Sequence, residues 1–333
     1  MVFSFLKLIR WPNLLIIAFT QYAIRWGVIY PVLHYVNSVL HQLYPDIVRE
    51  TLISMQLSEF NFFLIVFSTV LIAAAGYIIN DYFDVKLDRI NKPDDVLIDV
   101  KISRRAAIMW HWVLNISALL IALYLGFLTN TWKIVGLIYF MCASGLWFYS
   151  TTFKKQFLIG NVLVALFTAL VPILVGLFEI PLLLKKYGYL FIQTGIDISF
   201  MYKAIIAFSF FAFLTTLIRE LIKDVQDIEG DKAYGCETLP IKWGIKKAKL
   251  VLYSLCVVTI GCIGYLMKSQ YADGAVLSFY YLLFAVQVPL FVLIVSVFRS
   301  VEYKSFWLPS LITKVIMFLG VMYSAVIYIS FVK

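Results

Sequence analysis

Residues 61–88 read NFFLIVFSTVLIAAAGYIINDYFDVKLD, and this stretch decides the fold class. Its first part, 61–80, is almost entirely apolar, and a helix needs roughly 20 apolar residues to cross the hydrocarbon core of a bilayer. From Asn80 onward, aspartates recur among the remaining apolar residues. The stretch therefore predicts a membrane-spanning helix that carries acidic side chains at one end.

Eight further stretches are equally apolar and are bounded by polar or turn-forming residues. We therefore expect an all-α integral membrane protein, a bundle of about nine transmembrane helices that forms a single domain over residues 1–333. The N-terminal apolar run continues past Ile29 without a small-residue cleavage site, which favours a retained span over a signal peptide. The nine expected spans are 11–32, 61–80, 105–128, 132–150, 158–178, 201–222, 248–267, 274–298 and 307–331.

Composition agrees with a membrane protein. Of the 333 residues, 62% are hydrophobic and only 14% are charged, whereas soluble domains carry about 25% charged residues. The net charge of +9 comes from short basic clusters between apolar runs, which is typical of loops flanking membrane spans and argues against nucleic acid as a partner. The cysteines form no CxxC pair, so we interpret them as reduced packing residues; they are Cys142, Cys236, Cys256 and Cys262.

The distribution of basic residues predicts the orientation in the membrane. The side that holds the N-terminus carries 19 Lys and Arg residues and the other side 8, with Lys314 inside the last span assigned to neither. Because cytoplasmic loops carry the excess of Lys and Arg, we expect a plasma-membrane protein with the N-terminus and the polar loops 81–104 and 223–247 in the cytoplasm. The external connections 33–60 and 179–200 are long enough for short surface helices.

The acidic end of the second span contains Asn80, Asp84 and Asp88. At 100° per residue these side chains lie within about 80° of one another if the helix continues beyond the membrane. Asp81 lies to the side of this stripe. The spacing predicts a ladder of oxygen ligands along one helix face.

A second acidic motif occurs 144 residues later, at the end of the sixth span, and contains Asp224, Asp227 and Asp231. These three aspartates also share one helix face, with Glu229 on the opposite side. Four spans separate the motifs, so both emerge on the same side of the membrane. We expect the two ladders to face each other.

Facing carboxylates repel one another unless cations lie between them. Hard oxygen ligands suit Mg²⁺, which is commonly shared between carboxylates and substrate phosphates, so the ladders suggest a diphosphate held through Mg²⁺. For either motif taken alone, the alternative interpretation is a solvated helix end whose charged residues lie at the water boundary. An EF-hand is excluded by the ligand spacing, and a cation-coupled transporter would more often place its ionisable groups near the bilayer midplane.

Basic side chains near the ladders complement a diphosphate, because Arg and Lys neutralise charge on a departing anion. Membrane anchoring is the alternative for Lys154, Lys155 and Arg10. The candidates are Arg10 in Arg10-Trp11-Pro12-Asn13, Lys92 after the first ladder, Lys154 and Lys155 in the loop 149–155, and Arg219 and Lys223 before the second ladder.

The motifs resemble those of the UbiA superfamily of intramembrane prenyltransferases. The pattern NDxxDxxxD followed by NxP is matched by 80–88 and Asn91-Lys92-Pro93, and DxxDxxxD followed by G and TLP is matched by 224–231, Gly235 and 238–240. The entry at 10–13 and the stretch 149–161 also fit. The family commonly has a basic residue after NxP, whereas this chain has Asp94-Asp95. Arg104 and Arg105 are candidates to replace the missing positive charge.

The resemblance implies a central cavity that opens sideways to lipid, and a prenyl diphosphate bound through Mg²⁺ by the two motifs. Water must be kept from the allylic cation, which an apolar interior does, and aromatic faces can stabilise the cation. Asn80, Asp84, Asp227 and Asp231 would contact Mg²⁺, with Asp88, Asp224 and then Asp81 in support. The diphosphate would contact Lys154, Arg10, Asn13, Arg219 and Lys223, and Tyr149 would line the cavity near the allylic carbon; the catalytic candidates are Asp84, Asp227, Lys154 and Tyr149.

The acceptor is left open by the motifs, which bind the donor. The run 219–240 most resembles archaeal-type digeranylgeranylglyceryl phosphate synthases and their bacterial relatives. This favours geranylgeranylglyceryl phosphate as the lipophilic acceptor. An aromatic quinone precursor such as 4-hydroxybenzoate is the alternative.

Overall fold

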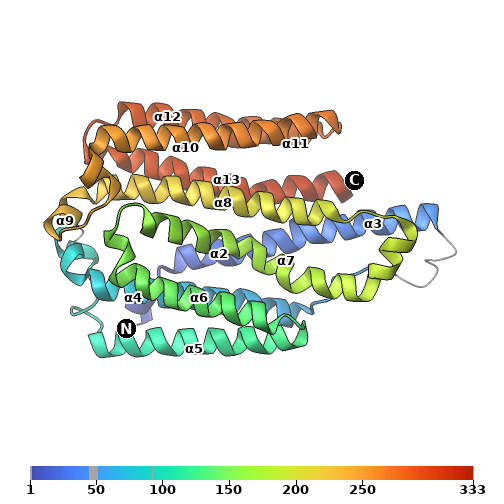
Figure 1. Cartoon of the computed structure of the whole chain (residues 1–333), viewed down its shortest axis with the longest axis horizontal. Helices are drawn as coiled ribbons and strands as arrows, with labels where there is room; N and C mark the ends of the chain where they lie inside the picture. Colours follow the sequence, from blue (N-terminus) through green and yellow to red (C-terminus); the bar gives the residue numbers. More distant parts are fainter. Residues whose placement is uncertain (1, 45–51, 92, 333) are drawn as a thin grey trace.

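The long helices run side by side along one axis (Figure 1). The structure is a computed structural model that describes residues 2–44, 52–91 and 93–332, and every element named in these ranges is helical. Nine of the described helices are long and apolar enough to span a membrane, which confirms the expected fold class. These spans are Trp11–Leu43, Glu59–Arg89, Arg104–Leu128, Trp132–Thr151, Ile159–Thr194, Ser199–Gln226, Leu239–Ala272, Val276–Arg299 and Tyr303–Val332.

The chain begins with a short helix α1 (Val2–Leu8), and Arg10 then turns it with a left-handed backbone (φ 51°). The first span is built from α2 (Trp11–Ile24), a π-helical turn η1 (Arg25–Ile29) and α3 (Tyr30–Leu43). Pro12 occupies the first turn of α2, where its missing N–H costs nothing.

The remaining elements follow in chain order. They are α4 (Glu59–Asn91), η2 (Pro93–Asp95), α5 (Arg104–Leu128), α6 (Trp132–Thr151), η3 (Phe153–Lys155), α7 (Ile159–Thr194), α8 (Ser199–Gln226), α9 (Ile228–Ala233), α10 (Leu239–Ala272), α11 (Val276–Tyr281), η4 (Leu282–Gln287), α12 (Val288–Arg299), η5 (Tyr303–Phe306) and α13 (Trp307–Val332).

Parts of the two expected external connections are continuations of spans. Residues 33–43 belong to α3 and residues 179–194 to α7, so the limits 32 and 178 were too short. Both segments remain apolar on their buried faces, and those faces pack together in the main core. Arg49, Lys92 and Lys333, which entered the charge count, lie outside the described residues.

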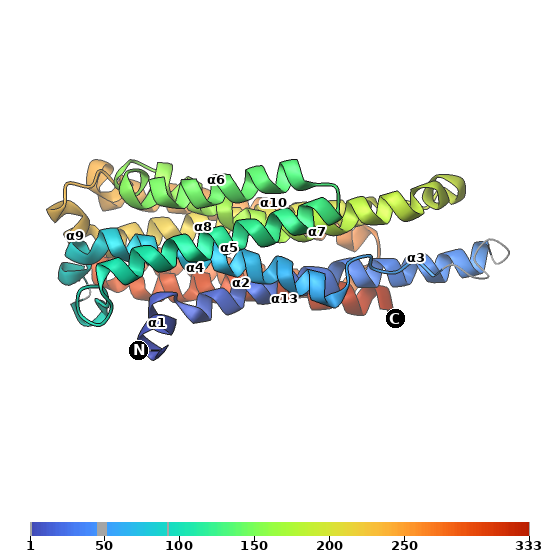
Figure 2. The same cartoon turned by 90° about the horizontal axis from the view of Figure 1, so that it is seen from below.

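The centre of the bundle is formed by α4, α7 and α8, whose spans are more than half buried. Helices α5 and α6 pack on α4, and α13 packs on both α2 and α8. Large apolar side chains that remain exposed, such as Ile116, Leu120 and Phe127 on α5, are placed to face lipid. We call the end where α4 finishes and α8 meets α9 the motif end; α1 also lies there, whereas α13 finishes toward the opposite end (Figures 1 and 2).

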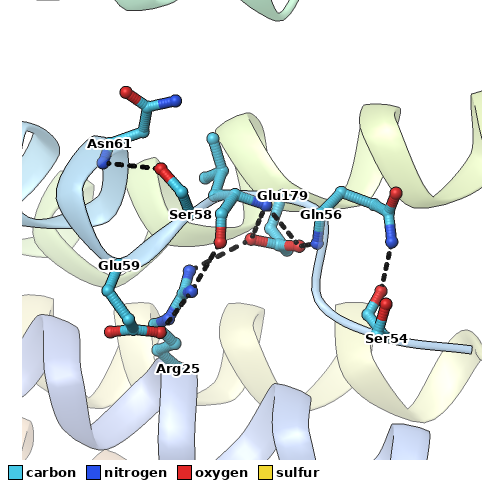
Figure 3. Close-up of polar contacts among 8 residues, drawn as sticks. Arg25, Ser54, Gln56, Ser58, Glu59, Asn61 and Glu179 are labelled. Carbon is cyan, nitrogen blue, oxygen red and sulfur yellow. Dashed lines mark hydrogen bonds and ion pairs between the residues drawn. The ribbon is translucent and has the colours of Figure 1, made fainter.

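The opposite end contains a buried ion-pair cluster (Figure 3). The fully buried Arg25 contacts Glu179 at 3.2 Å and Glu59 at 2.8 Å, and its guanidinium donates to the Leu57 carbonyl at 2.7 Å. Glu179 in turn accepts backbone N–H groups of Gln56 and Leu57. The cluster therefore fastens the segment before α4 to α7 and η1.

Candidate active site

A cavity of about 520 Å³ lies inside the bundle, between α2, α4, α6, α7, α8 and α13. Most of its wall is apolar. Polar side chains gather where it approaches the motif end; those on its wall are Arg10, Asn13, Tyr77, Asn80, Tyr149, Arg219, Glu220, Lys223 and Lys314. The arrangement suits a molecule with a long apolar part and an ionic head.

The first acidic motif lies on the last turns of α4, which continues without interruption to Asn91. Asn80 and Asp84 are buried, and the Asn80 amide donates to Asp84 Oδ2 at 2.8 Å. Asp88, one turn further on, is half-buried. The expected ladder on a continuous helix is therefore present in this motif.

Lys154 reaches this ladder from η3. Its ammonium forms an ion pair with Asp84. Burial lowers the pKa of Lys154, but the carboxylates of Asp84, Asp231 and Asp88 raise it by more, so its pKa lies above the ordinary value. One ammonium thus lies in the field of both acidic motifs.

The position of Lys154 depends on Gly160 in the first turn of α7. A Cβ atom at Gly160 would lie 2.9 Å from the Phe153 carbonyl oxygen and 3.1 Å from Lys154 Cα. The absence of a side chain lets η3 pack directly on α7.

The second acidic motif differs from the expected ladder. Helix α8 ends at Gln226 and Asp227 lies between α8 and α9, so the three aspartates do not lie on one regular helix. Backbone hydrogen bonds from Asp227 N–H to the Lys223 carbonyl (2.9 Å) and from Asp231 N–H to the Asp227 carbonyl (3.0 Å) keep the segment coiled. Gly230 and Gly235 in this short segment weaken helix propagation, which the spacing argument did not include.

Asp231 is the buried carboxylate of the second motif. Burial raises its pKa to about 6, and the neighbouring carboxylates of Asp227 and Asp84 add to this, while the ammoniums of Lys154 and Lys223 oppose it. Asp224 instead accepts a hydrogen bond from the Asn161 amide at 2.8 Å. The electrostatic link between Asp231 and Asp84 places the two motifs close together.

Two contacts tie the motifs to each other and to η3. The Tyr234 hydroxyl, just after the second motif, donates to the Lys86 carbonyl within the first motif at 3.1 Å. Glu237 N–H donates to the Lys155 carbonyl at 2.7 Å. These bonds fix the distance between segments that are far apart in sequence.

Arg10 approaches the first motif from the turn before α2. Its guanidinium pairs with Asp81 at 2.7 Å and lies 5.0 Å from the centre of the Tyr77 ring. Burial lowers the pKa of Arg10, but Asp81 and Tyr77 raise it above the ordinary value. Asn13 donates to the Tyr77 hydroxyl at 3.3 Å, so the predicted pair Arg10 and Asn13 is held at the cavity wall through Tyr77.

Arg219 and Lys223 lie on the cavity face of α8 and share a partner that the sequence argument missed. Arg219 donates to Glu220 at 2.8 Å, and the Lys223 ammonium lies 3.9 Å from the other Glu220 oxygen. Glu220 is buried, and it lines the cavity together with both basic residues. The spacing of these residues with Thr216, at i, i+3, i+4 and i+7, is the sequence signal that would have revealed this face.

Some predicted residues are not part of the cavity wall. Of the predicted metal ligands only Asn80 lines the cavity. The predicted residues outside the set of wall residues are Asp81, Asp84, Asp88, Lys154, Asp224, Asp227 and Asp231. The Arg104 guanidinium pairs with Asp99 at 2.9 Å in the loop before α5, so its suggested compensating role stays a prediction. The side chains of Asn91 and Asp95, and Lys92 as a whole, are outside the described part.

The residues present fit a divalent cation. Within 2–44, 52–91 and 93–332, no three acidic, His or Cys side chains already converge in a metal-binding arrangement. Carboxylates without a cation repel one another, and here the Lys154 ammonium lies between the motifs. Asn80 Oδ1 is buried and has no hydrogen-bond partner among the described residues, which leaves a hard oxygen ligand available beside Asp84.

Sequence comparison places this chain among known proteins. The profile of the UbiA prenyltransferase family matches residues 53–319. Digeranylgeranylglyceryl phosphate synthase of Methanosphaera stadtmanae is 34% identical over 185 residues, 56% of this chain and 58% of that protein. The enzyme of the same name from Methanothermobacter thermautotrophicus is 30% identical over 229 residues, 68% of this chain and 70% of that protein. The match to the first relative thus spans less than two thirds of its length.

Solved structures agree on the fold. A structure concerned with digeranylgeranylglyceryl phosphate synthase in membranes superposes with a TM-score of 0.62 at 21% identity, over 99% of each chain. A UbiA homologue from Archaeoglobus fulgidus bound to GPP and Mg²⁺ gives a TM-score of 0.57 at 18% identity, over 99% of this chain and 100% of that one. With its spans, its two acidic motifs and a family match that covers most of its length, the chain is an integral membrane protein that belongs to the UbiA prenyltransferase family.

Proposed function

We propose that the protein is a Mg²⁺-dependent prenyltransferase that transfers a prenyl group from a prenyl diphosphate to geranylgeranylglyceryl phosphate, releasing diphosphate, in ether-lipid synthesis. The observation that carries the proposal is the Lys154 ammonium, paired with Asp84 and in the field of Asp231, beside an apolar cavity. Such a site combines charge neutralisation at a leaving group with a dry chamber for the allylic carbon.

The residues proposed to hold Mg²⁺ are the oxygen-bearing side chains of both motifs. Asn80, Asp84, Asp227 and Asp231 are the main ligands; Asp88, Asp224 and Asp81 support them. When bound, Mg²⁺ neutralises negative charge on the diphosphate leaving group. The relative from Archaeoglobus fulgidus, solved with GPP and Mg²⁺, supports this proposal.

The chain's own cations complete the donor site in this proposal. Lys154 and Arg10 bind diphosphate oxygens, Asn13 orients Arg10 through Tyr77, and Arg219 and Lys223 add positive charge on the α8 wall. Tyr149 lines the cavity beside the reacting carbon. Apolar side chains around the prenyl tail exclude water, so the allylic cation is captured by the acceptor.

The acceptor assignment rests on the names of the relatives, which are digeranylgeranylglyceryl phosphate synthases. We also propose that residues 1–333 act as one domain and that the motif end faces the cytoplasm at the plasma membrane, where the basic residues gather.

A transfer assay on the purified protein tests the function. Geranylgeranyl diphosphate and Mg²⁺ are supplied with geranylgeranylglyceryl phosphate and 4-hydroxybenzoate in parallel, and products are identified by mass. We expect product with the glycerol phosphate. Product with the aromatic acid alone would overturn the acceptor, and absence of any prenyl transfer would overturn the proposed function.

A further inference from the structure

The α8 side of the cavity carries a carboxylate. Among the residues that the structure describes, Glu220 is the one acidic side chain on the cavity wall, whereas the aspartates of both motifs lie outside it. The Glu220 side chain is 8% exposed, and the cavity is the space that reaches it. Burial of a charged group is costly unless the group is paired, so this carboxylate calls for a chemical role.

Two cations compensate the charge of Glu220. Arg219 donates to Glu220 Oε1 at 2.8 Å, and the Lys223 ammonium lies 3.9 Å from Oε2. The second distance is too long for a hydrogen bond, and the two contacts together engage at most one lone pair on each oxygen. The carboxylate is therefore held as an ion and keeps capacity for a further hydrogen bond.

The Glu220 carboxylate lies where donor and acceptor must meet. Of the charged groups around the Tyr149 hydroxyl, Glu220 acts on it most strongly, and the proposed function places Tyr149 beside the reacting carbon. The cations of Arg10 and Lys154, which are proposed to bind the diphosphate, act on the same carboxylate. These groups come from α6, the turn before α2 and η3, so Glu220 faces the polar part of the cavity that they surround.

The proposed reaction releases a proton as well as diphosphate. In geranylgeranylglyceryl phosphate two of the glycerol oxygens carry the prenyl group and the phosphate, which leaves a single hydroxyl as the nucleophile. As the hydroxyl oxygen bonds to the allylic carbon, the bond from that carbon to diphosphate breaks and its electron pair leaves with the diphosphate. The hydroxyl proton must then go to a base, because a protonated ether is a strong acid.

We propose that the Glu220 carboxylate accepts a hydrogen bond from the acceptor hydroxyl and takes its proton as the ether bond forms. The products are the ether, diphosphate and a neutral Glu220 carboxyl group, which gives its proton to water when the products leave. A carboxylate is a sufficient base here, because the hydroxyl becomes acidic only as its oxygen bonds to carbon. This inference rests on the proposed function and assigns a catalytic residue to its acceptor side.

The first test compares Glu220→Gln with the wild type. Glutamine keeps the size of the side chain and an oxygen for Arg219, but it does not take up a proton. We expect kcat for transfer to geranylgeranylglyceryl phosphate to fall about 100-fold or more. The affinity for geranylgeranyl diphosphate with Mg²⁺ should not decrease, because Glu220 contributes no positive charge to the donor site.

Glu302→Gln is the control for this test. Glu302 is an exposed glutamate just before η5 and lies off the cavity wall. Its replacement makes the same chemical change away from the cavity, so kcat should equal that of the wild type.

A thiol acceptor separates proton transfer from a structural role. In this analogue a thiol group replaces the free hydroxyl of geranylgeranylglyceryl phosphate. A thiol loses its proton far more readily than an alcohol, so its attack depends less on a base. Relative to the wild type with the same acceptor, Glu220→Gln should lose less than about 10-fold with the thiol. Equal losses with the two acceptors would overturn the inference.

The outcomes distinguish this inference from the proposed function. A wild-type kcat for Glu220→Gln with the hydroxyl acceptor would overturn the inference alone, since diphosphate or water would then take the proton. Weaker donor binding by Glu220→Gln would also count against it, because the residue would then act through the donor site. Failure of the wild type to transfer a prenyl group to the hydroxyl acceptor would overturn both.

Discussion

The Lys154 ammonium pairs with Asp84 although the two residues lie 70 positions apart in the chain. The contact joins η3 to the last turns of α4, and Asp84 also accepts a hydrogen bond from Asn80, which lines the cavity. Because Asp231 and Asp88 act on the same ammonium, this one contact links both acidic motifs. The electrostatics of the site therefore centre on Lys154.

Removal of a central carboxylate should stop the reaction without unfolding the protein. We expect Asp84→Ala and Asp227→Ala each to reduce prenyl transfer by about 10²-fold or more, because stabilisation of the leaving group is lost. Thermal unfolding of the purified variants should remain cooperative, since both residues lie at helix ends. Full turnover by either folded variant would exclude its proposed role.

Calcium should replace magnesium poorly. Ca²⁺ is larger and takes more ligands in a looser geometry, whereas Mg²⁺ holds a few carboxylates and phosphates in a tight octahedron. Initial rates at saturating concentrations of each metal give the comparison. Equal rates would count against the proposed ligand set.

Magnesium affinity should depend on pH through Asp231. Burial raises the pKa of this carboxyl to about 6 in the metal-free protein, so below that pH a proton must leave before the metal binds. The apparent affinity for Mg²⁺ should therefore fall about tenfold for each pH unit below 6. Titrations of the metal-free protein with Mg²⁺ between pH 5 and 7.5 test this prediction. The Asp231→Asn variant should bind Mg²⁺ more weakly, and its affinity should show no inflection near pH 6.

Adding one methyl group at Gly160 should displace Lys154. A Cβ there would meet the Phe153 carbonyl and Lys154 Cα at about the closest approach atoms permit, and small displacements of catalytic groups have large effects on rate. We expect Gly160→Ala to lower kcat about 10-fold. Gly188→Ala is the control, since Gly188 is also in α7 and a Cβ there meets nothing within 4 Å; equal effects of both changes would exclude the positioning role.

The buried Arg25–Glu179 pair should matter for stability more than for chemistry. Glu179→Ala leaves the buried guanidinium with Glu59 as its remaining carboxylate and removes the acceptor of two backbone N–H groups, so we expect a loss of about 3 kcal/mol. The double variant Arg25→Met/Glu179→Met should recover part of this loss. Denaturant unfolding of the purified variants in detergent measures this loss in the free energy of unfolding. An unfolding midpoint of Glu179→Ala equal to that of the wild type would contradict the prediction.

The spans could be predicted from the sequence because they follow from local hydropathy. The two acidic motifs could be placed at the same end of the bundle because four spans separate them. Hydropathy identifies nine helices, and helical spacing aligns Asn80, Asp84 and Asp88 on α4. The break at Asp227 was not predicted, because the spacing argument assumed a continuous helix and did not include Gly230 and Gly235, which weaken helix propagation.

Glu220 and Thr216 escaped for a different reason. Their spacing with Arg219 and Lys223 indicates a shared helix face, but the sequence alone does not indicate that this face lines a cavity. Asn161 acts through a partner 63 positions away, a separation that no local pattern encodes. The site residues therefore need the packing of α7 against α8 before their roles can be stated.

The packed end around Arg25 also has a consequence for where the product goes. Beyond the cavity, Phe62, Ile65 and Phe178 are fully buried beside the Arg25–Glu179 pair, so the interior is closed at that end. Under the proposed function, a lipid made in this chamber therefore leaves toward the motif end or sideways into the bilayer, and not through the end that Arg25 and Glu179 close.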